Sequence, residues 1–267
     1  AARYCHDDVI ARLLSAGASV LSSSSRGATA LTAAAEGGCL HTVQTLLAAG
    51  AKVEHADATG ATALILASQG GYLEVVELLL EAGAEVNHTA DANVTALLLA
   101  AQHGHSEVLA TLLDAGADPG RVDYRNATAL ILASQYGHLE AASLLIETGA
   151  DVNAQRSDGV SALMMASQGG HVAILEALLK AGAELELERD DGGTALFFAA
   201  MFGRFGIVEK LLEAGCNVDH TASNGATAIK MARINGHPLV VARLRDAGAS
   251  GVKGKGRAVD INELFEQ

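Results

Sequence analysis

The sequence predicts an all-α fold, a solenoid in which helix–turn–helix units of one design stack along the chain. A Thr-Ala-Leu motif, with Ser or Ile replacing one residue in two copies, recurs every 33 residues and begins at Thr29, Thr62, Thr95, Thr128, Ser161, Thr194 and Thr227. The glycine that closes each unit has the same period and falls at Gly17, Gly50, Gly83, Gly116, Gly149, Gly182, Gly215 and Gly248. Hydrophobic residues make up 50% of the chain but aromatic residues only 3%, so Ala and Leu must supply the packing. A fixed period of this length indicates stacked repeats rather than one central core.

The unit that begins at residue 59 shows how each repeat is built. Residues 63–69 are predicted to form its first helix, which Thr62 caps and Gly71 ends. Leu73–Glu81 form the second helix, whose apolar residues share one helical face, and Gly83 ends it. Neither helix is long enough to be stable alone in water, so each needs the neighbouring unit to cover its apolar face.

An exposed turn, residues 86–93 in this unit, leads from each helix pair into the next. We therefore expect a truncated unit over residues 1–25, a repeat array over 26–250, and a tail over 251–267. Whole units begin at residues 26, 59, 92, 125, 158, 191 and 224. The tail starts as a Gly/Lys linker. For its last stretch, Asp260–Gln267, three alternatives stay open: a short helix folded on the last repeat, a peptide that binds a partner, or disorder.

Composition excludes several classes of protein. The formal net charge is −13 at pH 7 and no basic stripe is present, which argues against nucleic-acid binding. No apolar run approaches the length of about 18 residues that inserts into a membrane. Three cysteines do not make a disulfide framework, so we interpret Cys5, Cys39 and Cys216 as small, buried or half-buried residues of a reducing compartment. A cytoplasmic protein is therefore expected.

Two further motifs follow the same register. Gly-His occurs at Gly104-His105, Gly137-His138, Gly170-His171 and Gly236-His237, and Gly-Ala-Asp-Val-Asn occurs at 149–153. Together with Gly-x-Thr-Ala-Leu-x-x-Ala, these motifs resemble the ankyrin-repeat family over nearly the whole chain. The resemblance implies antiparallel helix pairs stacked side by side, with hairpin-like finger loops projecting from them. The family's usual Thr-Pro-Leu-His lacks its Pro and His in every copy here, so we expect Leu and Ile packing to supply more of the stability.

The resemblance also implies where partners bind, namely on the concave surface of the inner helices and on the finger loops. The inner-helix positions that match are Gln69, Gln102, His103, Gln135, Tyr136, Gln168, Met201 and Phe202. The finger positions that match are Arg121, Tyr124, Arg125, Arg156 and Arg189. We expect Tyr136, Met201 and Phe202 to be exposed anchors. Alternatives remain for each group: a glutamine ladder inherited by duplication, rings of Tyr136 and Phe202 folded over neighbouring helices, and finger charges that only interact with water.

The sequence predicts no metal site, no cofactor and no enzyme. Histidines that open the second helix of successive units are separated by about one helix-packing distance, roughly 8–10 Å. Zinc needs its ligands about 2 Å from a common centre, so such a ladder cannot close a site. The same argument applies to the finger histidines His55, His88 and His220. No nucleophile-elbow, zinc-protease or phosphate-loop motif occurs in the sequence.

The leading hypothesis is therefore a non-catalytic protein–protein interaction module that acts as a scaffold or adaptor. Two alternatives stay open. One is a permanent architectural subunit of a large cytoskeletal or membrane-associated assembly. The other is the regulatory ankyrin region of a longer enzyme or channel. Repeat scaffolds vary their surfaces freely, so the sequence does not identify the partner.

Overall fold

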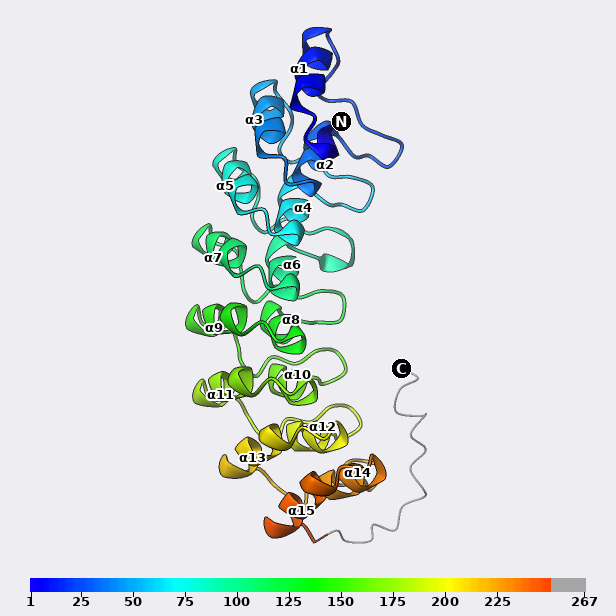
Figure 1. The fold of residues 1–267 in the computed structure, drawn as a ribbon, viewed down its shortest axis with the longest axis vertical. Helices are drawn as coiled ribbons and strands as arrows, with labels where there is room; N and C mark the ends of the chain where they lie inside the picture. Colours follow the sequence, from blue (N-terminus) through cyan, green and yellow to red (C-terminus); the bar gives the residue numbers. More distant parts are fainter. Residues whose placement is uncertain (251–267) are drawn as a thin grey trace. The chain divides into compact units, whose positions relative to one another are not determined.

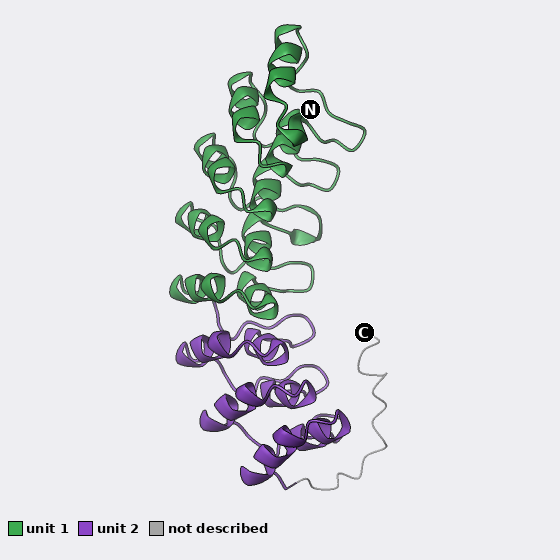
Figure 2. Ribbon diagram, viewed as in Figure 1, with its two compact units in different colours: residues 1–150 green, residues 151–267 purple. Residues whose placement is uncertain are grey.

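The computed structural model describes residues 1–250, which fold as short helices joined by loops (Figure 1). The chain forms two compact units, the first over Ala1–Ala150 and the second beginning at Asp151 (Figure 2). The boundary between them falls inside the predicted repeat 125–157. The tail 251–267, with the helix considered for Asp260–Gln267, lies outside the described residues.

Unit 1 contains the first helix pairs. Its α-helices are α1 (Asp7–Ser15), α2 (Ala30–Glu36), α3 (Leu40–Ala48), α4 (Ala63–Gly70), α5 (Leu73–Glu81), α6 (Ala96–His103), α7 (Ser106–Asp114), α8 (Ala129–Tyr136) and α9 (Leu139–Glu147). Two 3-10 turns, η1 (Ala2–Tyr4) and η2 (Asp91–Asn93), accompany them. The inner helices α2, α4, α6 and α8 pack side by side, and the outer helices α3, α5, α7 and α9 do the same (Figure 1). The predicted all-α solenoid of stacked helix pairs is confirmed in this unit.

Unit 2 repeats the arrangement. Its helices are α10 (Ala162–Gly169), α11 (Val172–Lys180), α12 (Ala195–Met201), α13 (Phe205–Glu213), α14 (Ala228–Ile234) and α15 (Pro238–Asp246). Inner helices α10, α12 and α14 pack in one row, and outer helices α11, α13 and α15 pack in another.

The core of each unit is built from residues that recur at one position of the repeat. In unit 1, leucines of the inner helices (Leu31, Leu64, Leu97, Leu130) and of the outer helices (Leu46, Leu79, Leu112, Leu145) are all buried. Each of these helices has nine residues or fewer, too short to be stable alone in water. Burial between neighbouring pairs therefore stabilises them, as the period predicted.

Finger loops connect the helix pairs. Each of four fingers ends in a short antiparallel pairing just before an inner helix: Ser23 with Thr29, Val122 with Thr128, Gln155 with Ser161, and Thr221 with Thr227. Neighbouring fingers also bond through their main chains. In unit 1, for example, the Ala58 N–H donates to the Arg26 carbonyl at 2.9 Å. These hydrogen bonds fix the main chain of the fingers, so the finger side chains project from a defined backbone.

Candidate protein-binding surface

The inner-helix surface of unit 1 is formed by the last turns of α4, α6 and α8. Each helix begins at a threonine whose side chain accepts a hydrogen bond from the backbone N–H three residues on; these are Thr62, Thr95 and Thr128. Each helix ends at a glycine in the left-handed conformation, as at Gly137 with φ 81°. Because start and end recur in register, the last turns of the three helices present equivalent positions.

Several of the side chains predicted to bind a partner are exposed in unit 1. Gln69 and His103 are exposed, and Gln102 and Gln135 are half-buried. Tyr136 is 50% exposed, so its predicted exposure is confirmed. The inner surface of this unit therefore combines one large aromatic ring with neutral amides and an imidazole.

Two histidines contact the main chain of this inner-helix surface. His105 and His138 each hold Nε2 3.0 Å from the main-chain carbonyl of a glutamine in the preceding repeat. Since a carbonyl only accepts, Nε2 carries the proton in both rings. The His138 ring stacks on Tyr136 with centroids 6.4 Å apart, and His105 stacks on His103 at 6.0 Å. These contacts give His105 and His138 a structural role between neighbouring repeats.

In unit 2 the equivalent surface differs from the prediction. Met201 is only 7% exposed, so its predicted exposure is wrong. Phe202 is half-buried and packs against a buried cluster formed by Phe197, Met201, Ala222, Ala226 and Met231. The physical reason is that both side chains are apolar and leave water by lying on the next finger and inner helix. The alternative in which Phe202 folds down over its neighbours is confirmed. Gln168 is half-buried.

The finger residues fall into two groups. Arg121, Tyr124 and Arg125 are exposed, and the Arg125 guanidinium lies 4.9 Å from the Tyr124 ring centroid. Arg121 pairs loosely with Asp118, its Nε 3.6 Å from the carboxylate.

Arg156 and Arg189 form the second group and are half-buried. Each pairs with an aspartate of its own finger: Arg156 with Asp158 at 2.9 Å, and Arg189 with Asp191. Arg189 also covers the Phe198 ring at 5.3 Å from its centroid. These two arginines stabilise their own fingers and are less available to a partner.

The structure brings together one cluster that the sequence did not indicate. Ligand atoms of Glu54, Glu85 and His88, from two neighbouring fingers, lie within 4.8 Å of one another. The prediction compared histidines of one repeat position at a time, whereas this group combines a histidine with two glutamates from other repeat positions. Glu54 Oε1 accepts from the Glu85 backbone N–H at 2.8 Å, and His88 Nε2 lies 3.0 Å from the Gly60 carbonyl. Contacts within the fold thus account for the positions of Glu54 and His88.

The interpretation of Cys5 and Cys39 as reduced residues is wrong, because they form a disulfide. Their separation of 34 residues is the separation of Gly71 and His105. At that pair, a Cβ placed on Gly71 would meet the His105 ring at 2.5 Å. The register of the Gly-His motif therefore predicts adjacent cysteines, and it was the signal that could have revealed the bond. The disulfide removes the support that this pair gave to a reducing compartment. The cytoplasmic location stays a prediction.

Cys216 is a free, half-buried thiol. Burial raises its pKa to about 11, and the nearby Glu186 carboxylate adds to the shift. The thiol is therefore protonated near neutral pH, which does not favour a nucleophilic role.

Stacked helix pairs with projecting fingers define a helical repeat protein. The family model for ankyrin repeats matches residues 1–90, 88–156 and 163–254, and the chain belongs to the ankyrin-repeat family. Ankyrin repeats are generally protein–protein interaction modules. No curated protein matches the chain. Among residues 1–250, no helix has the length and apolar character needed to cross a membrane.

Proposed function

We propose that the chain is a non-catalytic scaffold or adaptor whose contact with a partner protein is centred on Tyr136. The observation that carries the proposal is the half-exposed Tyr136 ring, held at a helix end by the stacked His138. Aromatic residues that combine an apolar face with a polar tip are over-represented among the residues that dominate binding energy. Their few rotatable bonds also keep the entropy cost of ordering low.

Neutral polar groups support a protein partner. Gln102, Gln135 and His103 share the inner-helix surface of unit 1 with Tyr136. A glutamine amide both donates and accepts, so it can pair with a peptide backbone without adding charge. Tyr124 and Arg125 extend the proposed contact to an exposed finger of the same unit, and Arg121 adds a loosely paired cation. In unit 2, only Gln168 remains from the predicted inner-helix set, because Met201 and Phe202 pack inward. The net charge of −13 supports a partner other than nucleic acid.

The test is the affinity of purified variants for a partner identified by cross-linking mass spectrometry of the native complex. Tyr136→Ala is expected to weaken binding at least about tenfold, a loss of about 1.4 kcal/mol. Phe202→Ala is the matched control at the same repeat position, and it is expected to leave affinity within about twofold. Equal affinities for wild type and Tyr136→Ala would reject Tyr136 as the centre of the contact. A partner that binds with no dependence on either residue would favour the finger loops.

A further inference from the structure

Several neighbouring finger loops are joined by hydrogen bonds with a fixed register, although Gly120, at the same repeat position, has no side chain to take part. A side-chain oxygen of one finger accepts from the backbone N–H of the residue 31 positions later. In unit 1, Glu54 accepts from Glu85 at 2.8 Å, and Asn87 accepts from Asp118 at 2.9 Å. In unit 2, the pairs are Asn153 with Glu184, Glu186 with Asn217, and Asp219 with Ser250, at 2.8, 2.7 and 2.9 Å. In these five pairs, a carboxylate or amide oxygen is the acceptor for this N–H.

The first finger lacks this acceptor. Its residue in the same register is Leu21, which precedes Lys52 by 31 positions and has no hydrogen-bonding atom in its side chain. The Lys52 N–H makes no hydrogen bond to any residue of the described chain. A backbone N–H is a strong donor that needs an acceptor, so this one is left for water or for a ligand.

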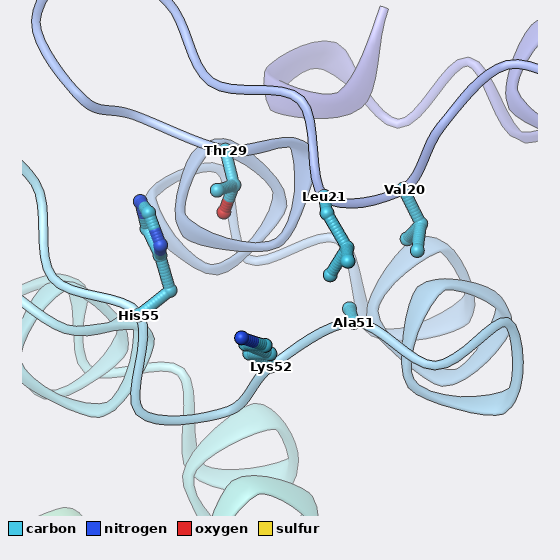
Figure 3. A pocket seen from close by; sticks show the side chains of 6 residues that line it. All are labelled: Val20, Leu21, Thr29, Ala51, Lys52 and His55. Carbon is cyan, nitrogen blue, oxygen red and sulfur yellow. The ribbon is translucent and has the colours of Figure 1, made fainter.

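A pocket of about 100 Å³ lies at this point, lined by Val20, Leu21, Thr29, Ala51, Lys52 and His55 (Figure 3). Figure 3 shows the Lys52 ammonium end between the side chains of His55 and Leu21. Lys52 forms no ion pair with another described residue, and it is exposed. The His55 ring is held by its Nε2, 2.7 Å from the Gly27 carbonyl. The pocket thus joins an apolar wall to Lys52, a residue that carries both a cation and an unpaired backbone N–H.

Neither of the two fingers beside this pocket offers it a free carboxylate. The first finger, residues 16–29, contains no Asp or Glu. In the second finger, Glu54 is bonded to Glu85. Asp57 accepts from the Thr59 backbone and hydroxyl and from the Ala61 N–H. Burial acts to raise the pKa of Asp57, but these hydrogen bonds outweigh it and lower the pKa, so this carboxylate stays ionised in its own turn.

We propose that the pocket binds the carboxylate of a glutamate or aspartate side chain from a partner polypeptide. One carboxylate oxygen accepts from the Lys52 N–H, in the place that Glu54 and Glu186 fill for the fingers that follow them, and the ammonium of Lys52 provides the opposite charge. A water occupies about 30 Å³, so the pocket has room for a carboxylate and one or two methylenes along Val20 and Leu21. The site does not include Tyr136, and its recognition is independent of the proposed inner-helix contact.

The test is an NMR titration of the full chain, labelled with ¹⁵N, with N-acetylglutamate N-methylamide and its glutamine counterpart as probes. The glutamate probe is expected to shift the Lys52 amide signal in a saturable way, and the glutamine probe to bind at least about tenfold more weakly. Leu21→Glu supplies an internal carboxylate in the register of these hydrogen bonds, so it is expected to weaken binding of the glutamate probe at least about tenfold. Leu21 is 51% exposed, so this substitution is compatible with the fold. Leu21→Met is the matched control, because it keeps the apolar wall without adding a charge.

Retained binding in Leu21→Met and lost binding in Leu21→Glu, with other amide signals unchanged, is the predicted result. An unmoved Lys52 amide, equal affinity for the two probes, or undiminished binding by Leu21→Glu would each overturn the site. None of these results depends on Tyr136, so they are separate from the test of the proposed function.

Discussion

Helices α8 and α12 present the same repeat positions but expose different surfaces. Tyr136 of α8 is 50% exposed, whereas Phe202, 66 residues later, lies half-buried against a buried cluster. The residue before each ring differs too: Gln135 is half-buried, and Met201 is 7% exposed. Repeat position alone does not decide exposure. The side chain's own chemistry contributes, because an apolar pair gains by packing on the next finger and a pair with polar ends loses less by facing water.

The C-terminal ends of α8 and α12 also differ. Helix α8 includes Tyr136 and stops at Gly137 in the left-handed conformation, with φ 81°. Helix α12 stops one residue earlier, at Met201, and Phe202 is its C-cap. The two helices thus differ in where they end as well as in how the side chains at this end pack.

The largest difference in the free energy of unfolding is expected when Met201 and Gln135, the residues before Phe202 and Tyr136, are each replaced by Ala. Met201→Ala should lower the free energy of unfolding of unit 2 by about 2–4 kcal/mol, because it removes a buried side chain and leaves a cavity. Gln135→Ala is the matched change in α8 and should cost less than about 0.5 kcal/mol. Urea denaturation, followed by amide hydrogen exchange of α12 and α8, measures both. Equal losses would show that the two helices bury this position alike.

A smaller effect of opposite sign is expected one position earlier. The Ser134 hydroxyl in α8 is buried and has no hydrogen-bond partner among residues 1–250, whereas α12 has Ala200 at the same repeat position. Ser134→Ala should therefore stabilise unit 1 by about 1 kcal/mol, because a buried polar group without a partner is costly. The converse change, Ala200→Ser, should destabilise unit 2 by about 1–3 kcal/mol. A loss of stability in Ser134→Ala, measured by the same denaturation, would contradict this account.

The smallest expected difference lies at the helix starts. The Thr128 side chain accepts a hydrogen bond from the Ile131 N–H at 3.3 Å, whereas Thr194 makes no side-chain cap bond at the start of α12. Thr128→Ala should cost about 1 kcal/mol. Thr194→Ala should cost less than Thr128→Ala because it removes no capping bond. Thermal or urea unfolding of the two variants, compared with wild type, checks the order; a larger loss for Thr194→Ala would reverse the comparison.

Much of the fold could be predicted from the repeated motifs. Leu73–Glu81 was predicted with the bounds that α5 has, and Thr62 caps α4 as expected. These features depend on residues close together in sequence, and the 33-residue period extends them to every repeat.

Features that depend on contacts between repeats were harder to predict. Met201 packs inward with Ala222 and Ala226 of the following finger. Both residues are small, whereas earlier fingers vary at both positions. The disulfide of Cys5 and Cys39 required reading two motifs of different repeats as one contact. The exposure of Tyr136 also depends on contacts with neighbouring repeats, so the sequence left two alternatives open: an exposed ring or a ring folded over the neighbouring helices.

Site-specific photo-cross-linking tests the central claim most directly, that Tyr136 faces the partner and Phe202 does not. A photoreactive phenylalanine analogue replaces Tyr136 in one variant and Phe202 in another, and each variant is irradiated with the same purified partner. The account predicts a cross-link to the partner from position 136 and only internal products from position 202. A cross-link from position 202 with none from position 136 would contradict it.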